Sequence, residues 1–161
     1  EETDVDLADG TTQDLAKEVL NISDGSITYD SEGIKNTLVL ASQGQKVPTG
    51  DGNFTVIRAS LLRLILAIHE EGISIRISSF TGGEHSETSL HYLGKALDIG
   101  NEEVAGPLMK FVYKNRKTLN IDELIYASPP NGTSNLDIGN PHEYSSGTLS
   151  AHKNHIHIAV F

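Results

Sequence analysis

The chain reads Ser-Leu-His-Tyr-Leu-Gly-Lys-Ala-Leu-Asp at residues 89–98, and a second histidine-rich stretch near its end reads His-Lys-Asn-His-Ile-His at residues 152–157. Neutral imidazole and carboxylate are groups that zinc binds readily, and three protein ligands plus a water form a catalytic rather than a structural site. His91, Asp98 and His157 supply such a set. The two stretches therefore predict the two halves of one zinc site.

Alternation and helical spacing around these stretches predict the neighbouring elements. Residues 73–78 and 155–160 alternate between apolar and polar side chains, as half-buried strands do, so that His155 and His157 share one face. Short strands are also expected at 96–100 and 123–126. Apolar residues at helical spacing predict helices near 12–20, 55–71 and 103–120. Residues 31–54 are ambiguous, and the Pro-, Gly- and Ser-rich residues 128–150 predict a long loop.

Neither histidine stretch is specific alone, but their combination resembles the LAS metallopeptidases over residues 55–161. These proteins include D-Ala-D-Ala carboxypeptidases and dipeptidases, murein endopeptidases and the related hedgehog signalling domain. The resemblance implies an α+β fold, with a small, mostly antiparallel sheet flanked by the 55–71 and 103–120 helices. It also implies zinc ligation by His91, Asp98 and His157. The alternative is a buried His91 that is hydrogen-bonded to Asp98 without a metal. Gly94 and Ala96 are small enough to let the ligand-bearing turn pack closely.

His155 is the candidate general base, since it lies two residues before His157 on the same strand face. One branch of the family uses a glutamate three residues before the last ligand, but this chain has Asn154 there, which is no proton acceptor. The chain instead resembles the His-x-His branch. His152 matches a further active-site histidine of that branch, where it could orient His155, stabilise an oxyanion or simply lie on the surface.

Three residues are candidates for substrate binding. Ser89 matches the family serine, although its hydroxyl could also stabilise a turn. His85 follows two glycines and is expected to line the cleft rather than to act as a fourth metal ligand, because a catalytic site keeps one position open. Many relatives carry an arginine after the first strand, where this chain reads Ser79-Phe80-Thr81. Arg76 could replace that arginine or be a solvated surface residue.

Composition sets outer limits on the protein. The 161 residues fit one folded unit, which we place at 31–161, after an acidic tail and short helix at 1–30. The net charge of -10 argues against nucleic acid as a partner. Since there is no cysteine, a metal must be held by histidine and carboxylate. No apolar run approaches the roughly 20 residues that span a bilayer, and we expect a monomer.

The expected function is zinc-dependent hydrolysis of peptide bonds. The resemblance implies peptidoglycan stem peptides or cross-links as substrates, by a carboxypeptidase or endopeptidase action, and an extracellular or cell-envelope location in bacteria. Two alternatives stay open. One is a non-catalytic, zinc-bearing binding or signalling module of the same fold; the other is a hydrolase of a different amide.

Overall fold

The computed structural model describes residues 7–161, so the first six residues of the predicted acidic tail lie outside the described part of the chain. Its main sheet has seven strands in the order β1-β4-β5-β9-β6-β7-β8. Strand β1 (Ile27–Tyr29) pairs in parallel with β4 (Ile75–Ser79), and the other pairs are antiparallel. The protein is therefore α+β with a mixed, mostly antiparallel sheet, which confirms the predicted class.

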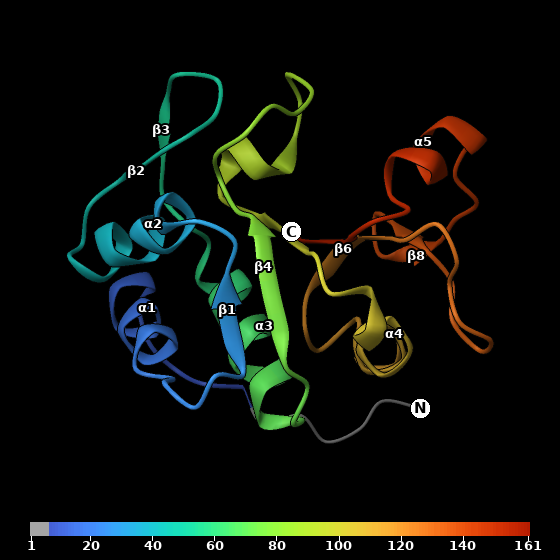
Figure 1. Ribbon diagram of the computed structural model, residues 1–161, viewed down its shortest axis with the longest axis horizontal. Helices are drawn as coiled ribbons and strands as arrows, with labels where there is room; N and C mark the ends of the chain where they lie inside the picture. The colour runs from blue at the N-terminus through green and yellow to red at the C-terminus, as the bar shows by residue number, and fades with distance from the viewer. Residues whose placement is uncertain (1–6) are drawn as a thin grey trace.

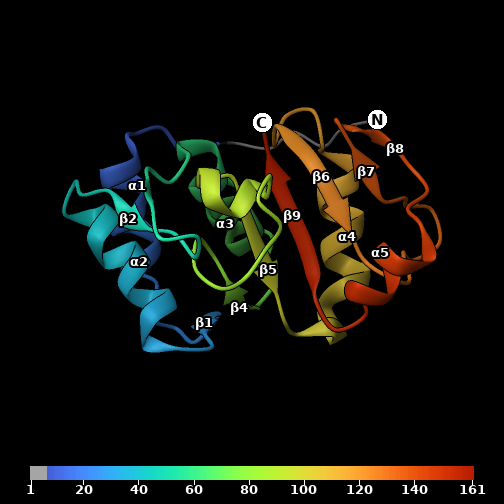
Figure 2. The ribbon, with the colours of Figure 1, turned by 90° about the horizontal axis from the view of Figure 1, so that it is seen from above.

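The last strand of the chain lies at the centre of this sheet. β9 (Ile156–Val160) is inserted between β5 (Ala96–Ile99) and β6 (Ile121–Ile125), as Figure 2 shows. Figure 1 shows β1 beside β4 on the far side of β5. The Leu97 and Ile158 pair and the Ile99 and Ile156 pair are buried in the hydrophobic core. Because side chains alternate along a strand, Asp98 and His157 lie on the opposite face.

Two helices cover the core face of the sheet. α3 (Ala59–Glu70) and α4 (Ala105–Lys114) lie behind the central strands in Figure 2, whereas the short 3₁₀ helix η1 (Leu90–Leu93) lies in front of them. α3 begins later than the predicted residue 55, because β3 (Phe54–Thr55) pairs with β2 (Val47–Pro48). α4 follows the short 3₁₀ helix η2 (Glu102–Val104) and ends before residue 120.

The N-terminal segment packs into the same core. α1 (Thr12–Leu20) has the predicted bounds, and Thr11 caps it by accepting a hydrogen bond from the Asp14 amide. Its residues Leu15, Ala16 and Val19 are fully buried against the neighbouring helices. The ambiguous residues 31–54 contain α2 (Glu32–Ser42) and the β2–β3 hairpin. The described residues before position 31 are thus continuous in packing with those that follow.

The segment 128–150 differs from the prediction of a long loop. It contains β7 (Leu136–Asp137), β8 (Asn140–Pro141) and α5 (Ser146–Ala151). The hairpin extends the sheet beyond β6, and the Tyr144 hydroxyl donates to the Leu136 carbonyl at 2.7 Å. These tertiary contacts order residues whose composition alone favours a loop. Across the described residues, every helix is too short or too polar to cross a membrane.

Candidate metal centre

Strand register brings two of the predicted ligands together. Asp98 of β5 lies directly opposite His157 of β9, and the distance between Asp98 Oδ1 and His157 Nδ1 is 3.1 Å. Both residues are buried, although they are polar. Burying a carboxylate and an imidazole costs free energy, because both lose their water. Their mutual contact offsets part of this desolvation cost.

The third predicted ligand comes from η1. The Ser89 hydroxyl caps this turn by accepting the His91 amide at 3.2 Å. Gly94 ends the turn with φ of 70°, and a Cβ there would lie 2.3 Å from the Val56 carbonyl oxygen. Glycine is required because the turn packs directly on the chain before α3. The turn places His91 Nε2 at 3.3 Å from Asp98 Oδ1.

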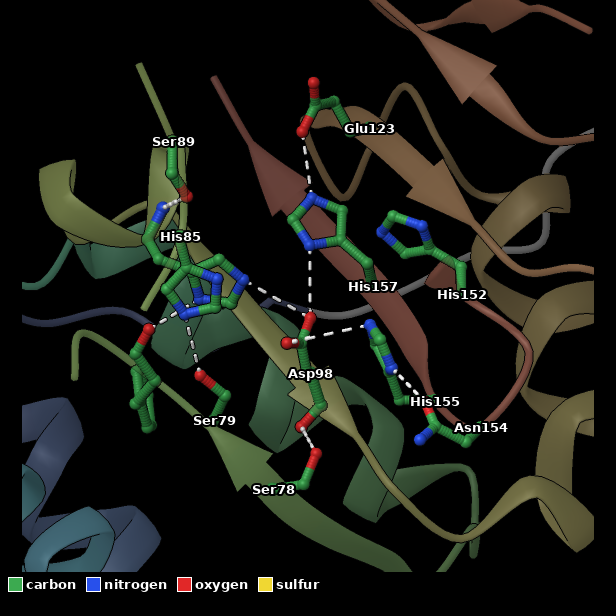
Figure 3. A network of polar contacts seen from close by, with 12 residues as sticks. Ser78, Ser79, His85, Ser89, Asp98, Glu123, His152, Asn154, His155 and His157 are labelled. Atoms are coloured by element: carbon green, nitrogen blue, oxygen red, sulfur yellow. Dashed lines mark hydrogen bonds and ion pairs between the residues drawn. The ribbon is translucent and has the colours of Figure 1, made fainter. Parts of the chain in front are cut away.

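The outer nitrogen of each of these imidazoles has a fixed acceptor. His91 Nδ1 donates to the Phe80 carbonyl at 2.6 Å, and His157 Nε2 donates to Glu123 Oε1 at 2.9 Å. The inner nitrogens therefore both face Asp98 Oδ1, and Figure 3 shows this contact for His157. A neutral imidazole has only one N–H, so in the neutral form each inner nitrogen presents a lone pair to the carboxylate. A proton or a cation must then lie between each of these nitrogens and Asp98.

The ionisation of the site agrees with this need for positive charge. Burial raises the pKa of Asp98, but its hydrogen bonds with His157 and His91 outweigh burial and hold that pKa well below its usual value. Burial lowers the pKa of His157, whereas its hydrogen bonds with Asp98 and Glu123 outweigh burial and raise it to about 9. The hydrogen bond from His157 also lowers the pKa of Glu123. The two carboxylates thus favour positive charge around His157.

The candidate base lies beside this centre. His155 Nε2 is 3.9 Å from Asp98 Oδ2, and its Nδ1 is 2.7 Å from Asn154 Oδ1. With Asn154 as the acceptor, Nδ1 carries the proton and Nε2 keeps its lone pair for the site. Burial, more than the neighbouring histidines, lowers the pKa of His155. The imidazole is accordingly neutral near pH 7, which suits a proton acceptor.

His152 is positioned by α5. Its Nδ1 donates to the Thr148 carbonyl at 2.7 Å, so the other ring nitrogen is unprotonated in the neutral residue. The His152 ring centre lies 5.0 Å from that of His155 and 5.8 Å from that of His157. The structure therefore places His152 at the site rather than apart from it.

His85 lies against the other side of the centre. Its ring stacks on His91 with 3.9 Å between ring centres and 7° between planes, and burial lowers its pKa. Tyr92 fixes the His85 segment, because its hydroxyl accepts the His85 amide at 2.7 Å. His85, His91 and Asp98 offer ligand atoms that all lie within 4.8 Å of one another. These three residues could hold a metal ion.

The predicted residues do not all meet here. A pocket of about 300 Å³ is lined by the candidate ligands and base, and by Ser89, His85, His152 and Glu123. Arg76 does not line it. Its guanidinium instead pairs with Asp30 at 2.5 Å and donates to the Gly100 carbonyl at 2.7 Å. Arg76 is exposed, as a surface residue would be, but these partners fix its guanidinium instead of leaving it fully solvated.

Glu123 is the site residue that sequence reasoning missed. The strand that carries it was predicted, yet its contact with His157 depends on the β6–β9 register, which brings together segments 34 residues apart. Two adjacent carboxylates, Asp122 and Glu123, within an otherwise apolar strand were the available signal.

A scan against protein-family models finds no match for the chain, and a search of curated proteins also finds none.

Proposed function

We propose that the protein is a zinc-dependent hydrolase of peptide bonds with a LAS-type fold, and that His91, Asp98 and His157 are its zinc ligands. The proposal rests on the combination of motifs in the sequence and on the geometry of the candidate centre. Its substrates would be peptidoglycan stem peptides or cross-links. The motif resemblance alone supports this substrate class and the cell-envelope location that it implies.

The orientation of the two ligand imidazoles carries the metal proposal. Each outer N–H is held by a fixed acceptor, the Phe80 carbonyl or Glu123, so each inner lone pair faces Asp98. Metal-binding histidines typically donate their other N–H in this way, which fixes the ring and its tautomer. One divalent cation would satisfy both inner nitrogens and the carboxylate at once. Without a metal, the raised pKa of His157 supplies a proton on its side, but His91 Nε2 would also need a second proton to bind Asp98.

The donor set fits zinc, and it favours His157 over His85 as the third ligand. Imidazole and carboxylate suit zinc, and three protein ligands leave a position open. Lone pairs of imidazole lie in the ring plane, but the His85 and His91 planes are nearly parallel and stacked. In these orientations the in-plane lone pairs of the two rings run nearly parallel, so this pair suits a single ion less well than His91 and His157, whose planes are tilted by 59°. His85 is better placed to contact substrate, since its Nε2 already meets Ser79 Oγ and the Gly82 carbonyl.

The chain's own residues would supply the proton transfers. A zinc ion held by His91, Asp98 and His157 would polarise a substrate carbonyl and lower the pKa of a bound water to about 7. His155 Nε2 would accept a proton from the attacking water and deliver it to the leaving amine, because its Nδ1 is engaged with Asn154. His152 would stabilise the developing oxyanion or orient His155 from its position at the end of α5. Ser89 holds the turn that carries His91.

The deciding experiment compares the parent protein with His155→Ala and with a matched control, His142→Ala. His142 is exposed on the surface and does not line the site pocket. Each protein is loaded with zinc, its bound zinc is quantified, and it is incubated with stem peptides, cross-linked muropeptides and an unrelated peptide. Mass spectrometry identifies each cleaved bond. We expect His155→Ala to retain zinc and to lose activity by about 100-fold or more, while His142→Ala matches the parent.

Other outcomes separate the alternatives. Full zinc occupancy without cleavage of any peptide would favour a zinc-bearing binding or signalling module. Cleavage of the unrelated peptide alone would keep the hydrolase and remove peptidoglycan as its substrate. If the parent binds no zinc, or if His155→Ala keeps full activity, the proposed centre or the proposed base is wrong.

A further inference from the structure

We propose that His152, His155 and Asp98 Oδ2 form a site for a second zinc ion, and that this ion inhibits the enzyme when it is bound. The inhibition rests on the proposed hydrolase function, whereas the binding of the ion does not require turnover. Asp98 Oδ1 faces the two proposed ligand imidazoles, but Asp98 Oδ2 faces His155, whose Nε2 lies 3.9 Å away. The carboxylate is therefore placed to bridge two ions.

The spacing of His152 and His155 fits ligation of one ion. Their ring centres are 5.0 Å apart and their planes are tilted by 45°. The proposed ligand pair His91 and His157 has nearly the same arrangement, with 5.1 Å between ring centres and a tilt of 59°. Two ligand atoms of one zinc ion can be at most about 4.2 Å apart, because each lies about 2.0–2.1 Å from the metal. The 3.9 Å between His155 Nε2 and Asp98 Oδ2 is within this limit.

Both imidazoles have the tautomer that a metal ligand needs. His152 Nδ1 donates to the Thr148 carbonyl at 2.7 Å, and His155 Nδ1 donates to Asn154 Oδ1 at 2.7 Å. Each neutral ring therefore keeps the lone pair of its Nε2 for a ligand. Across residues 7–161, no hydrogen bond engages either Nε2. Metal-binding histidines typically have their other N–H held by an acceptor in this way.

The local fold holds the two rings on one side of Asp98. His155 directly precedes β9, and His152 follows α5, where its carbonyl accepts the Ala127 amide at 3.1 Å. Figure 3 shows both rings on the side of Asp98 that is opposite His85. Both residues line the site pocket of about 300 Å³, which has room for a second ion and its bound water. The second site thus opens into the same pocket as the first.

The second ion should bind more weakly than the first. Imidazole and carboxylate oxygen suit zinc at both sites. However, the second ion shares the charge of Asp98 with the first ion, and its other two ligands are neutral imidazoles. Two divalent cations at this separation also repel each other. We expect the affinity of the second site to be lower by about tenfold or more, so that the two sites fill in sequence.

Occupancy of the second site would remove the general base. His155 Nε2 is the atom that is proposed to accept a proton from the attacking water, and a lone pair that binds zinc cannot accept a proton. The ion would engage His152 Nε2 in the same way and withdraw it from the oxyanion. Zinc above one equivalent should therefore inhibit hydrolysis, and partial removal of zinc should restore it.

The test titrates metal-free protein with zinc and counts the bound ions by native mass spectrometry. His152→Ala and His155→Ala each remove one ligand of the second site and no ligand of the first. His142→Ala is the matched control, because His142 is exposed and does not line the site pocket. X-ray absorption at the zinc edge measures the distance between two bound ions. Peptide cleavage is measured at one and at several equivalents of zinc.

We expect two zinc ions in the parent and in His142→Ala, separated by about 3.5–4 Å, as in other two-metal sites. At the same zinc concentration, His152→Ala and His155→Ala should each hold one ion. Excess zinc should lower the kcat of the parent by about tenfold or more, whereas His152→Ala should keep the activity that it has with one equivalent.

The two proposals can fail separately, because the ions are counted without turnover. A parent that takes up one ion only, or a second ion that persists in both variants, would overturn the second site. Two bound ions with undiminished cleavage would overturn the inhibition. Two bound ions in a parent that cleaves no peptide would remove the hydrolase and the inhibition together, and would leave the second metal site as the part that is confirmed.

Discussion

A single hydrogen bond outside the proposed ligand set controls the state of His157. Glu123 holds the Nε2 proton of this imidazole, which leaves Nδ1 directed at Asp98. Without the carboxylate, the other tautomer of His157 becomes available and the ring is free to turn. Partners of this kind typically contribute 10- to 100-fold to metal affinity.

We therefore expect Glu123→Ala to weaken zinc affinity by about 10- to 100-fold, and Glu123→Gln to weaken it less, because a glutamine oxygen still accepts the N–H. Competition with a chromophoric chelator measures the affinity. Glu70→Ala is the control, since Glu70 is exposed on α3, away from the site pocket. Equal zinc affinity in Glu123→Ala and in the parent would show that His157 does not need this partner.

At the scale of elements, the position of η1 depends on one glycine. Gly94 adopts φ of 70° and lies against the Val56 carbonyl, so alanine there is strained by its conformation and by contact. We expect Gly94→Ala to lower the free energy of unfolding by about 1–3 kcal/mol and to weaken zinc binding, because His91 moves with the turn. Urea denaturation and zinc titration measure the two effects.

Gly106→Ala provides the matched control for this substitution. Gly106 lies in α4, where a Cβ meets no atom within 4 Å, and alanine is the better helix former. The Gly106→Ala protein should be at least as stable as the parent, and its zinc affinity should be unchanged. If Gly94→Ala behaves like Gly106→Ala, the close approach of η1 to Val56 does not determine the site.

Elements differ in how far their sequence predicts them. The strand that carries His157 alternates clearly, and the spacing of His91 and Asp98 marks a turn followed by a strand, so local pattern sufficed for these. The hairpin at 136–141 did not follow from composition, because the Asp122 carboxylate and the Tyr144 hydroxyl hold it through tertiary contacts. The Glu123 contact likewise depends on strand pairing, which no local pattern encodes.

At the scale of the whole molecule, the segment before α2 contributes to the stability of the site. Leu15 of α1 is fully buried in the same core as α3, which supports the sheet from behind. Replacing it with alanine removes apolar contact and leaves a cavity. We expect Leu15→Ala to lower the free energy of unfolding by about 2–5 kcal/mol. Urea denaturation followed by far-ultraviolet circular dichroism and by tyrosine fluorescence measures the change.

The two signals distinguish one folding unit from two. If the core is continuous, both signals change in a single transition, and that transition moves to lower urea in Leu15→Ala as a whole. Leu93→Ala is the control, because Leu93 is 52% exposed and its loss should change stability little. A separate early transition in Leu15→Ala, with the tyrosine signal unmoved, would mean that α1 unfolds independently. Because the strands that carry Asp98 and His157 pack on this core, a single transition would also mean that the candidate centre is lost together with α1.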